Sequence, residues 1–135
     1  LLNDELLCVP MVIEESSVVA AAAKSAKFWM DRGGFKSEVI SLNKVGQVHF
    51  IWEGATSKIE SLFNEVKEDL LDSVKPLTLN MEKRGGGLLS IKLVDRSFDE
   101  PGYYQIWAEF NTCDAMGANF INSVLEALGK NFSDI

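Results

Sequence analysis

The segment from Tyr103 to Leu128 places a strand directly before a helix, and it constrains the fold more than any other stretch. Apolar and polar residues alternate from Tyr103 to Thr112, as in a half-buried strand. Apolar residues then recur at helical spacing: Met116, Phe120, Val124 and Leu128, with Ile121 and Leu125 beside them. Asp114 is a residue type that favours the N-cap position, so we expect it to cap this helix.

The predicted helix start is made of small residues, namely Ala115, Gly117 and Ala118. Small side chains leave the unpaired N–H groups of a first helical turn accessible, so a flat or anionic ligand can lie against them. A dinucleotide pyrophosphate suits this geometry. The alternative interpretation is that the small residues only allow the helix start to pack tightly. The residue pattern alone leaves both interpretations open.

The string from Asp114 to Asn119, Asp-Ala-Met-Gly-Ala-Asn, resembles the cofactor motif of the 3-hydroxy-3-methylglutaryl-coenzyme A reductases. A second stretch, from Val9 to Ala22, resembles the catalytic-glutamate segment of the same family. Further similarity lies at Gly33-Gly34-Phe35 and at Lys83-Arg84-Gly85-Gly86-Gly87. The resemblance is to the bacterial class II enzymes. It spans nearly the whole chain but only part of such an enzyme.

The resemblance implies that the chain is part of an oxidoreductase that interconverts hydroxymethylglutaryl-CoA with mevalonate and CoA, through two hydride transfers with NAD or NADP. By resemblance, Glu15 is the catalytic acid and Ser17 contacts the hydroxymethylglutaryl group. The residues that would hold the dinucleotide are Asp114, Ala115, Met116, Gly117 and Asn119. The family also needs a lysine, an aspartate and a histidine from segments that would follow residue 135, so we expect the isolated chain to be inactive. One departure from the family pattern is Ser16, where proline is common.

Glu15 precedes an apolar pattern that predicts a helix from about Ser17 to Met30. The first half of this helix, from Val18 to Ala23, has almost no polar face, so we expect it to be buried in a larger body. A carboxyl group at the start of a buried apolar helix is well suited to donate a proton. The alternative is that Glu14 and Glu15 only interact favourably with the helix dipole.

Four further elements are predicted in the middle of the chain. Strand-like runs extend from Phe35 to Leu42 and from Val45 to Trp52. Ser57-Lys58-Ile59-Glu60 has the pattern of a capping box, and it begins a helix that we expect Pro76 to end. Residues 89–93 form a further strand, joined to the strand at residues 104–110 by a turn at residues 99–102.

The order strand, helix, strand, strand, helix predicts an α+β fold. It is the ferredoxin-like split βαβ arrangement, an antiparallel sheet covered by two helices, with its last strand missing. We predict that residues 1–34 are a large-domain segment carrying Glu15, and that residues 35–135 are a small cofactor-binding domain truncated at its C-terminus. An open sheet edge and an apolar helix predict self-association of the isolated chain, as a homodimer or larger species.

Composition excludes several other functions. The sequence holds 13 Lys and Arg against 20 Asp and Glu, a net charge of −7, which disfavours nucleic acid and anionic membrane surfaces as partners. There is no apolar run of about 20 residues and no signal-peptide pattern at the N-terminus, so we expect a cytoplasmic protein. Cys8 and Cys113 lack metal-binding spacing, and we predict no metal site.

Three other features receive no catalytic role. His49 lies on the polar side of its predicted strand, where a single histidine is usually solvated. Cys113 has no histidine partner that would make it a nucleophile. Lys83-Arg84-Gly85-Gly86-Gly87 lacks the ending of a phosphate-binding loop and is interpreted as a turn into a strand.

A different class of function, a non-catalytic ferredoxin-like domain that binds an effector or a partner, fits the composition and the topology equally well. It does not explain the presence of both motifs, at Val9 to Ala22 and at Asp114 to Asn119, in one chain.

Overall fold

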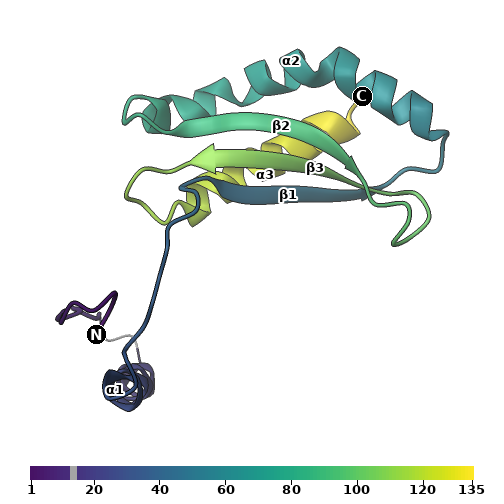
Figure 1. Cartoon of the computed structure of the whole chain (residues 1–135). Helices are drawn as coiled ribbons and strands as arrows, with labels where there is room; N and C mark the ends of the chain where they lie inside the picture. Colours follow the sequence, from purple (N-terminus) through teal and green to yellow (C-terminus); the bar gives the residue numbers. More distant parts are fainter. Residues whose placement is uncertain (13–14) are drawn as a thin grey trace. The chain divides into compact units, whose positions relative to one another are not determined.

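The computed structural model of the chain describes residues 1–12 and 15–135. The chain forms two compact units, Leu1–Ser41 and Leu42–Ile135 (Figure 1). Ile13 and Glu14, which belong to the catalytic-glutamate resemblance, lie outside the described residues. The assignment of residues 1–34 to a large domain and of residues 35–135 to a small domain remains a prediction.

The first unit is built around helix α1, Ser16–Met30, which agrees with the predicted helix within one residue at its start. The helix ends because Gly33 and Gly34 take left-handed φ angles of 92° and 73°, and the Gly34 N–H then donates to the Trp29 carbonyl at 2.8 Å. No residue of α1 is buried within the part of the chain that the structure describes.

The predicted strand from Phe35 to Leu42 is wrong. Only Phe35 makes a β-bridge, to Leu2, and Ile40 is 93 % exposed. The side chain of Asn3 bonds instead to the backbone of Ser37, with its Nδ2 donating to the Ser37 carbonyl and its Oδ1 accepting from the Ser37 N–H at 2.8 Å. A strand needs a neighbouring strand to pair with its backbone groups, and the composition of a single run cannot supply one.

The second unit contains a three-stranded antiparallel sheet with the order β1-β3-β2. The strands are β1 (Lys44–Ile51), β2 (Gly87–Asp95) and β3 (Tyr103–Asn111). The central strand β3 pairs Ile106 with Val48 of β1 and with Leu93 of β2. The predicted α+β class, its order of elements and the hairpin of β2 and β3 are therefore confirmed.

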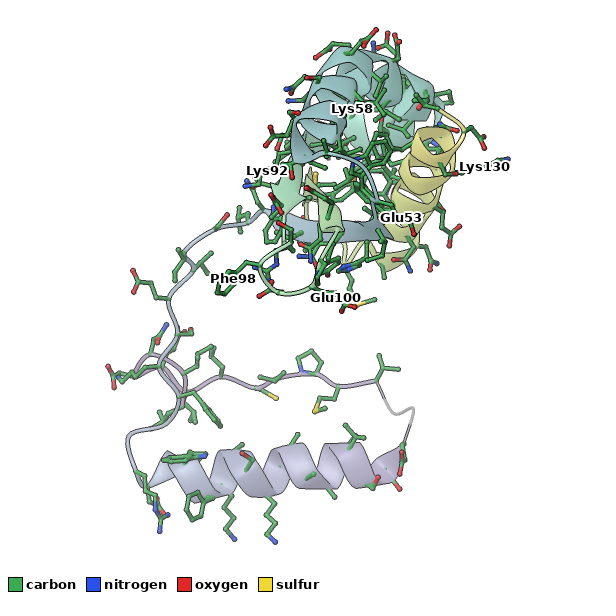
Figure 2. All side chains as sticks on the ribbon, turned by 90° about the vertical axis from the view of Figure 1, so that its right-hand side faces the viewer. Glu53, Lys58, Lys92, Phe98, Glu100 and Lys130 are labelled. Atoms are coloured by element: carbon green, nitrogen blue, oxygen red, sulfur yellow. The ribbon has the colours of Figure 1, made fainter. Side chains whose placement is uncertain are left out.

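Helices α2 (Thr56–Glu82) and α3 (Ala118–Ser133) cover one face of this sheet, with α2 over β2 and α3 over β1 (Figure 1). The core lies between the two layers. Its buried members come from α2, β2, β3 and α3: Phe63, Leu70, Val74, Ile91, Ile106, Ala108, Phe110, Val124 and Leu128. Charged side chains such as Lys130 point outward, and Phe98 stands exposed at the tip of the β2–β3 hairpin (Figure 2).

The predicted ends of α2 are wrong at both termini. Ala55 is the N-cap, and Ser57 lies inside the helix, so no capping box forms. The helix starts early because Thr56 hydrogen-bonds through its hydroxyl to the Tyr104 hydroxyl at 2.9 Å, which ties its first turn to the sheet. It continues through Pro76 because the following turn buries Thr78 and Met81, and this burial offsets the N–H that proline lacks.

None of the helices within residues 1–12 and 15–135 has the length and apolar composition needed to cross a bilayer. The same residues contain no group of three His, Cys, Asp or Glu side chains arranged to hold a metal ion.

Candidate functional site

The loop between β3 and α3 carries the predicted cofactor motif, and its geometry differs from the prediction in two respects. Asp114 is not the N-cap of α3. The N-cap is Gly117, with φ 79° and ψ 9°, and the helix begins at Ala118. The intervening residues form a turn in which the Ala115 N–H donates to the Thr112 carbonyl at 3.1 Å. Met116 is 79 % exposed, so the buried face of α3 starts at Phe120 instead.

Thr112 anchors this turn from inside the protein. Its side chain is 1 % exposed, and its hydroxyl donates to the Ala115 carbonyl at 2.6 Å. The Lys44 ammonium donates to the same carbonyl at 2.6 Å and also to the Thr112 hydroxyl. Sequence reasoning missed both residues. The register that pairs Lys44 with Phe110, beside the end of β3, exists only in the folded sheet.

Gly117 is required by the fold of the loop itself. Its positive φ of 79° is unfavourable for any residue with a Cβ atom. An added Cβ would also overlap Thr112 Cγ2 and lie 2.8 Å from Thr112 Cβ. At this position the interpretation that a small residue permits tight packing is supported directly.

The start of α3 is nevertheless open. The first α-helical hydrogen bond runs from the Ile121 N–H to the Gly117 carbonyl at 2.9 Å, so the N–H groups of Ala118, Asn119 and Phe120 precede the hydrogen-bonded ladder. Among the described residues, no side chain caps them. A surface cavity of about 290 Å³ lies at this end of the helix, lined by Met116, Gly117, Ala118, Asn119 and Phe120. Asp114 and Ala115 are outside that lining.

The turn at Lys83 to Gly87 lies directly beside the motif. The Cys113 thiol donates to the Arg84 carbonyl at 3.2 Å, and an added Cβ on Gly86 would collide with the Asn111 carbonyl. The expected turn into a strand is confirmed. Its exposed cations, Lys83 and Arg84, therefore belong to the same surface region as the motif.

Glu15 and Ser17 lie together in the first unit. Glu15 is the N-cap of α1, with extended backbone angles, and the Ser17 hydroxyl donates to the Glu15 carboxylate at 2.5 Å. Both side chains are exposed in this unit. The structure thus brings Glu15 and Ser17 together in the first unit. In the second unit it brings Met116, Gly117 and Asn119 together.

Comparison with known proteins decides the family. The sequence matches the family model of hydroxymethylglutaryl-coenzyme A reductase over residues 1–135. The chain belongs to the hydroxymethylglutaryl-coenzyme A reductase family. This membership favours a reductase over the alternative of a non-catalytic ferredoxin-like interaction domain.

Relatives of this reductase-family chain support the assignment. A solved class II reductase from Streptococcus pneumoniae, bound to NADPH in open conformations, is 32 % identical and has a TM-score of 0.63, with 99 % of this chain and 36 % of that chain covered. The Borreliella burgdorferi protein named "Probable 3-hydroxy-3-methylglutaryl-coenzyme A reductase" is 32 % identical over 96 % of this chain and 28 % of its own length. The Archaeoglobus fulgidus reductase is 28 % identical over 87 % of this chain and 27 % of its own length. The chain thus spans about a third or less of each relative.

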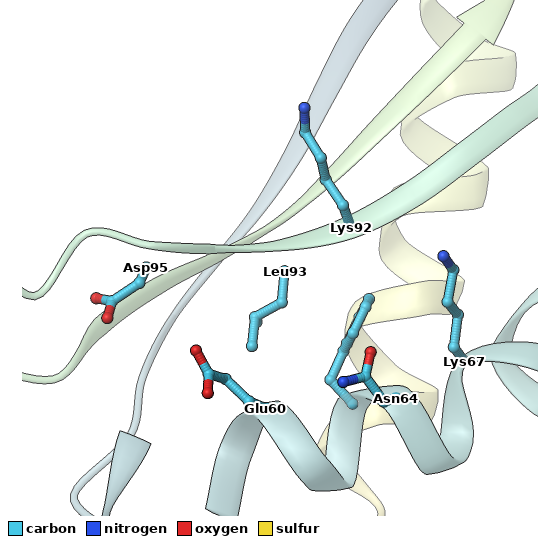
Figure 3. A pocket seen from close by; sticks show the side chains of 7 residues that line it. Glu60, Asn64, Lys67, Lys92, Leu93 and Asp95 are labelled. Atoms are coloured by element: carbon cyan, nitrogen blue, oxygen red, sulfur yellow. The ribbon is translucent and has the colours of Figure 1, made fainter. Parts of the chain in front are cut away.

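Two other cavities of the reductase-family chain lie away from the motif. One cavity, of about 320 Å³, is lined by residues of α2 and β2, with Glu60 and Asn64 on the helix side (Figure 3). Lys92 also lines this cavity, although its ammonium points away from α2 (Figure 3). The other, of about 510 Å³, has a mainly apolar lining that includes Phe50, Ile59 and Phe132.

His49 lies on the sheet face opposite the helices, as predicted. It is exposed, and its Nδ1 lies 2.6 Å from the Tyr103 hydroxyl. None of the expected site residues is hydrogen-bonded to it, and it receives no role.

Proposed function

We propose that this chain is the part of a class II hydroxymethylglutaryl-CoA reductase that supplies the dinucleotide-binding loop and the catalytic glutamate. The whole enzyme would convert hydroxymethylglutaryl-CoA to mevalonate and CoA, or the reverse. The observation that carries the proposal is the uncapped start of α3, beside a cavity lined by Met116, Gly117 and Asn119, in a chain that matches the reductase family throughout.

The motif residues fit a dinucleotide for a physical reason. The free N–H groups at Ala118, Asn119 and Phe120 point along the helix axis toward its N-terminus, and the helix dipole favours a negative charge there. A pyrophosphate supplies that charge. Asn119 adds a side-chain amide at the cavity wall, while Asp114 and Ala115 shape the approach to it. When bound, the nicotinamide supplies the hydride for each reduction step.

Glu15 would act as the proton donor to the carbonyl oxygen that becomes a hydroxyl. The hydrogen bond from Ser17 holds one oxygen of the Glu15 carboxyl group, and the other oxygen would carry the proton that is donated. Ser17 would also contact the hydroxymethylglutaryl group, next to the same carboxyl group. A proton donor raises the rate only when it is held at the reacting atom, and both residues lie at the start of α1, Glu15 as its N-cap and Ser17 in its first turn.

The proposal is tested in the full-length protein that carries this chain, by following NADPH and NADH consumption with hydroxymethylglutaryl-CoA. Glu15→Gln keeps the size of the side chain but removes the proton donor, so kcat should fall by about 100-fold or more. The KM for the dinucleotide should stay within about twofold of the wild type. Glu38→Gln, an exposed glutamate in the same unit, is the matched control and should behave as wild type. Unchanged turnover in Glu15→Gln would reject the role of Glu15.

The same assay applies to the 135-residue chain alone, which should show no turnover in either direction. Proton transfer and charge stabilisation act as a unit, so one carboxyl group from an incomplete set contributes little. Mevalonate-dependent reduction of NAD or NADP by the purified chain would overturn this part of the proposal.

A further inference from the structure

The side chain of Lys44 connects β1 to the loop of residues 112–117 between β3 and α3, called the motif loop below. Lys44 lies on the helix-covered face of β1, together with Val48 and Phe50 at alternate positions. Its ammonium donates to the Ala115 carbonyl and to the Thr112 hydroxyl. The Ala115 carbonyl thus accepts two hydrogen bonds, one from a charged donor and one from a buried hydroxyl.

Holding this carbonyl also fixes the N–H group that follows it. The peptide between Ala115 and Met116 is trans, as are all the peptides of the described chain. In a trans peptide the carbonyl and the next N–H point in opposite directions. Because the Ala115 carbonyl points toward Lys44, the Met116 N–H points away from it. Met116 is also the first loop residue that lines the cavity at the start of α3.

We propose that Lys44 is a positioning residue for dinucleotide binding, acting through the Ala115 carbonyl. Together with Thr112, it holds the Ala115–Met116 peptide so that the Met116 N–H joins the open N–H groups at the start of α3. This inference rests on the proposed function. Without Lys44 the Ala115 carbonyl loses its charged hydrogen bond and keeps only the one from the Thr112 hydroxyl, so the peptide is held less firmly.

The test uses the full-length protein and measures dinucleotide binding directly, by the fluorescence of NADPH on titration, beside steady-state kinetics. In Lys44→Met the Kd and the KM for the dinucleotide should rise about tenfold, which corresponds to about 1.4 kcal/mol. The KM for hydroxymethylglutaryl-CoA and kcat at saturating dinucleotide should stay near the wild-type values. Lys44→Arg keeps a cationic donor and should restore most of the affinity. Lys92→Met, which removes an exposed lysine on β2, is the matched control.

A second pair of variants keeps the test decisive if Lys44→Met folds poorly. Thr112→Val has nearly the same shape but no hydroxyl, so it should weaken dinucleotide binding in the same direction. Thr112→Ser retains the hydroxyl and should bind more tightly than Thr112→Val. An unchanged dinucleotide Kd in both Lys44→Met and Thr112→Val would overturn the positioning role. A wild-type protein that binds no dinucleotide would instead reject the proposed function itself.

Discussion

The buried side chain of Thr112 occupies the space that a Cβ atom on Gly117 would need. The two residues lie at opposite ends of the motif loop, and Gly117 can follow the turn only in a left-handed conformation. The glycine of the cofactor motif is therefore needed for the path of the chain, whatever ligand lies outside it. Substitutions at Gly117 consequently affect stability as well as ligand binding.

We predict that Gly117→Ala lowers the free energy of unfolding by at least about 1–2 kcal/mol, the cost of a left-handed conformation for a residue with a Cβ, with the overlap on Thr112 added to it. Urea unfolding of the chain measures this change. Gly85→Ala is the matched control, because its φ is 89° but no atom lies within 4 Å of the added Cβ. Gly85→Ala should lose only the conformational part.

Adding Thr112→Ser to Gly117→Ala removes Cγ2, the closest of the overlapping atoms, and should recover part of the loss. Equal losses in Gly117→Ala and Gly85→Ala, with no recovery in the double variant, would contradict the steric relationship.

A second prediction concerns Pro76, which is exposed in the interior of α2. Pro76→Ala restores a backbone N–H at a helical position and should raise the free energy of unfolding by about 1–2 kcal/mol. Proline and alanine differ by more than this in intrinsic helix propensity. Alanine also gives the unfolded chain more conformational freedom, and that freedom offsets part of the difference. Glu65→Ala, another exposed position of α2, should change stability by less than about 0.5 kcal/mol. A lower urea midpoint for Pro76→Ala would show that the helix depends on the proline.

A third prediction is that the chain self-associates through α1. None of this helix is buried among the described residues, and Val18, Phe28, Trp29 and Met30 are 42–55 % exposed. Such an apolar helix surface is suited to pack against a second copy. Light scattering coupled to size exclusion should therefore give a dimer or larger species at micromolar concentration.

Ala21→Glu places a charge one turn from Val18 on the apolar side and should break the assembly. Ala20→Glu adds the same charge one turn before Lys24, and it should leave the assembly intact. A single 15.0 kDa species for the wild type across tens of micromolar would refute self-association.

The sequence predicted the elements whose residues repeat with a clear period. Helix α1, the hairpin of β2 and β3, and the buried face of α3 from Phe120 onward all follow from periods of 3.6 and 2. Errors arose where the outcome depends on a distant partner. The run from Phe35 to Leu42 is strand-like in composition, but among the described residues only Phe35 is paired, through a single bridge to Leu2. Pro76 does not end α2 because burial of the next turn outweighs the missing N–H.

The sequence by itself determined the family of this protein, through two motifs about a hundred residues apart. It also determined the order of strands and helices. Only the tertiary structure decided how the motif loop is held. Lys44 and Thr112 are 68 residues apart, and Lys44 and Ala115 are 71 apart, yet they share hydrogen bonds. Local periodicity carries no information about such contacts, because strand register alone brings the start of β1 to the end of β3.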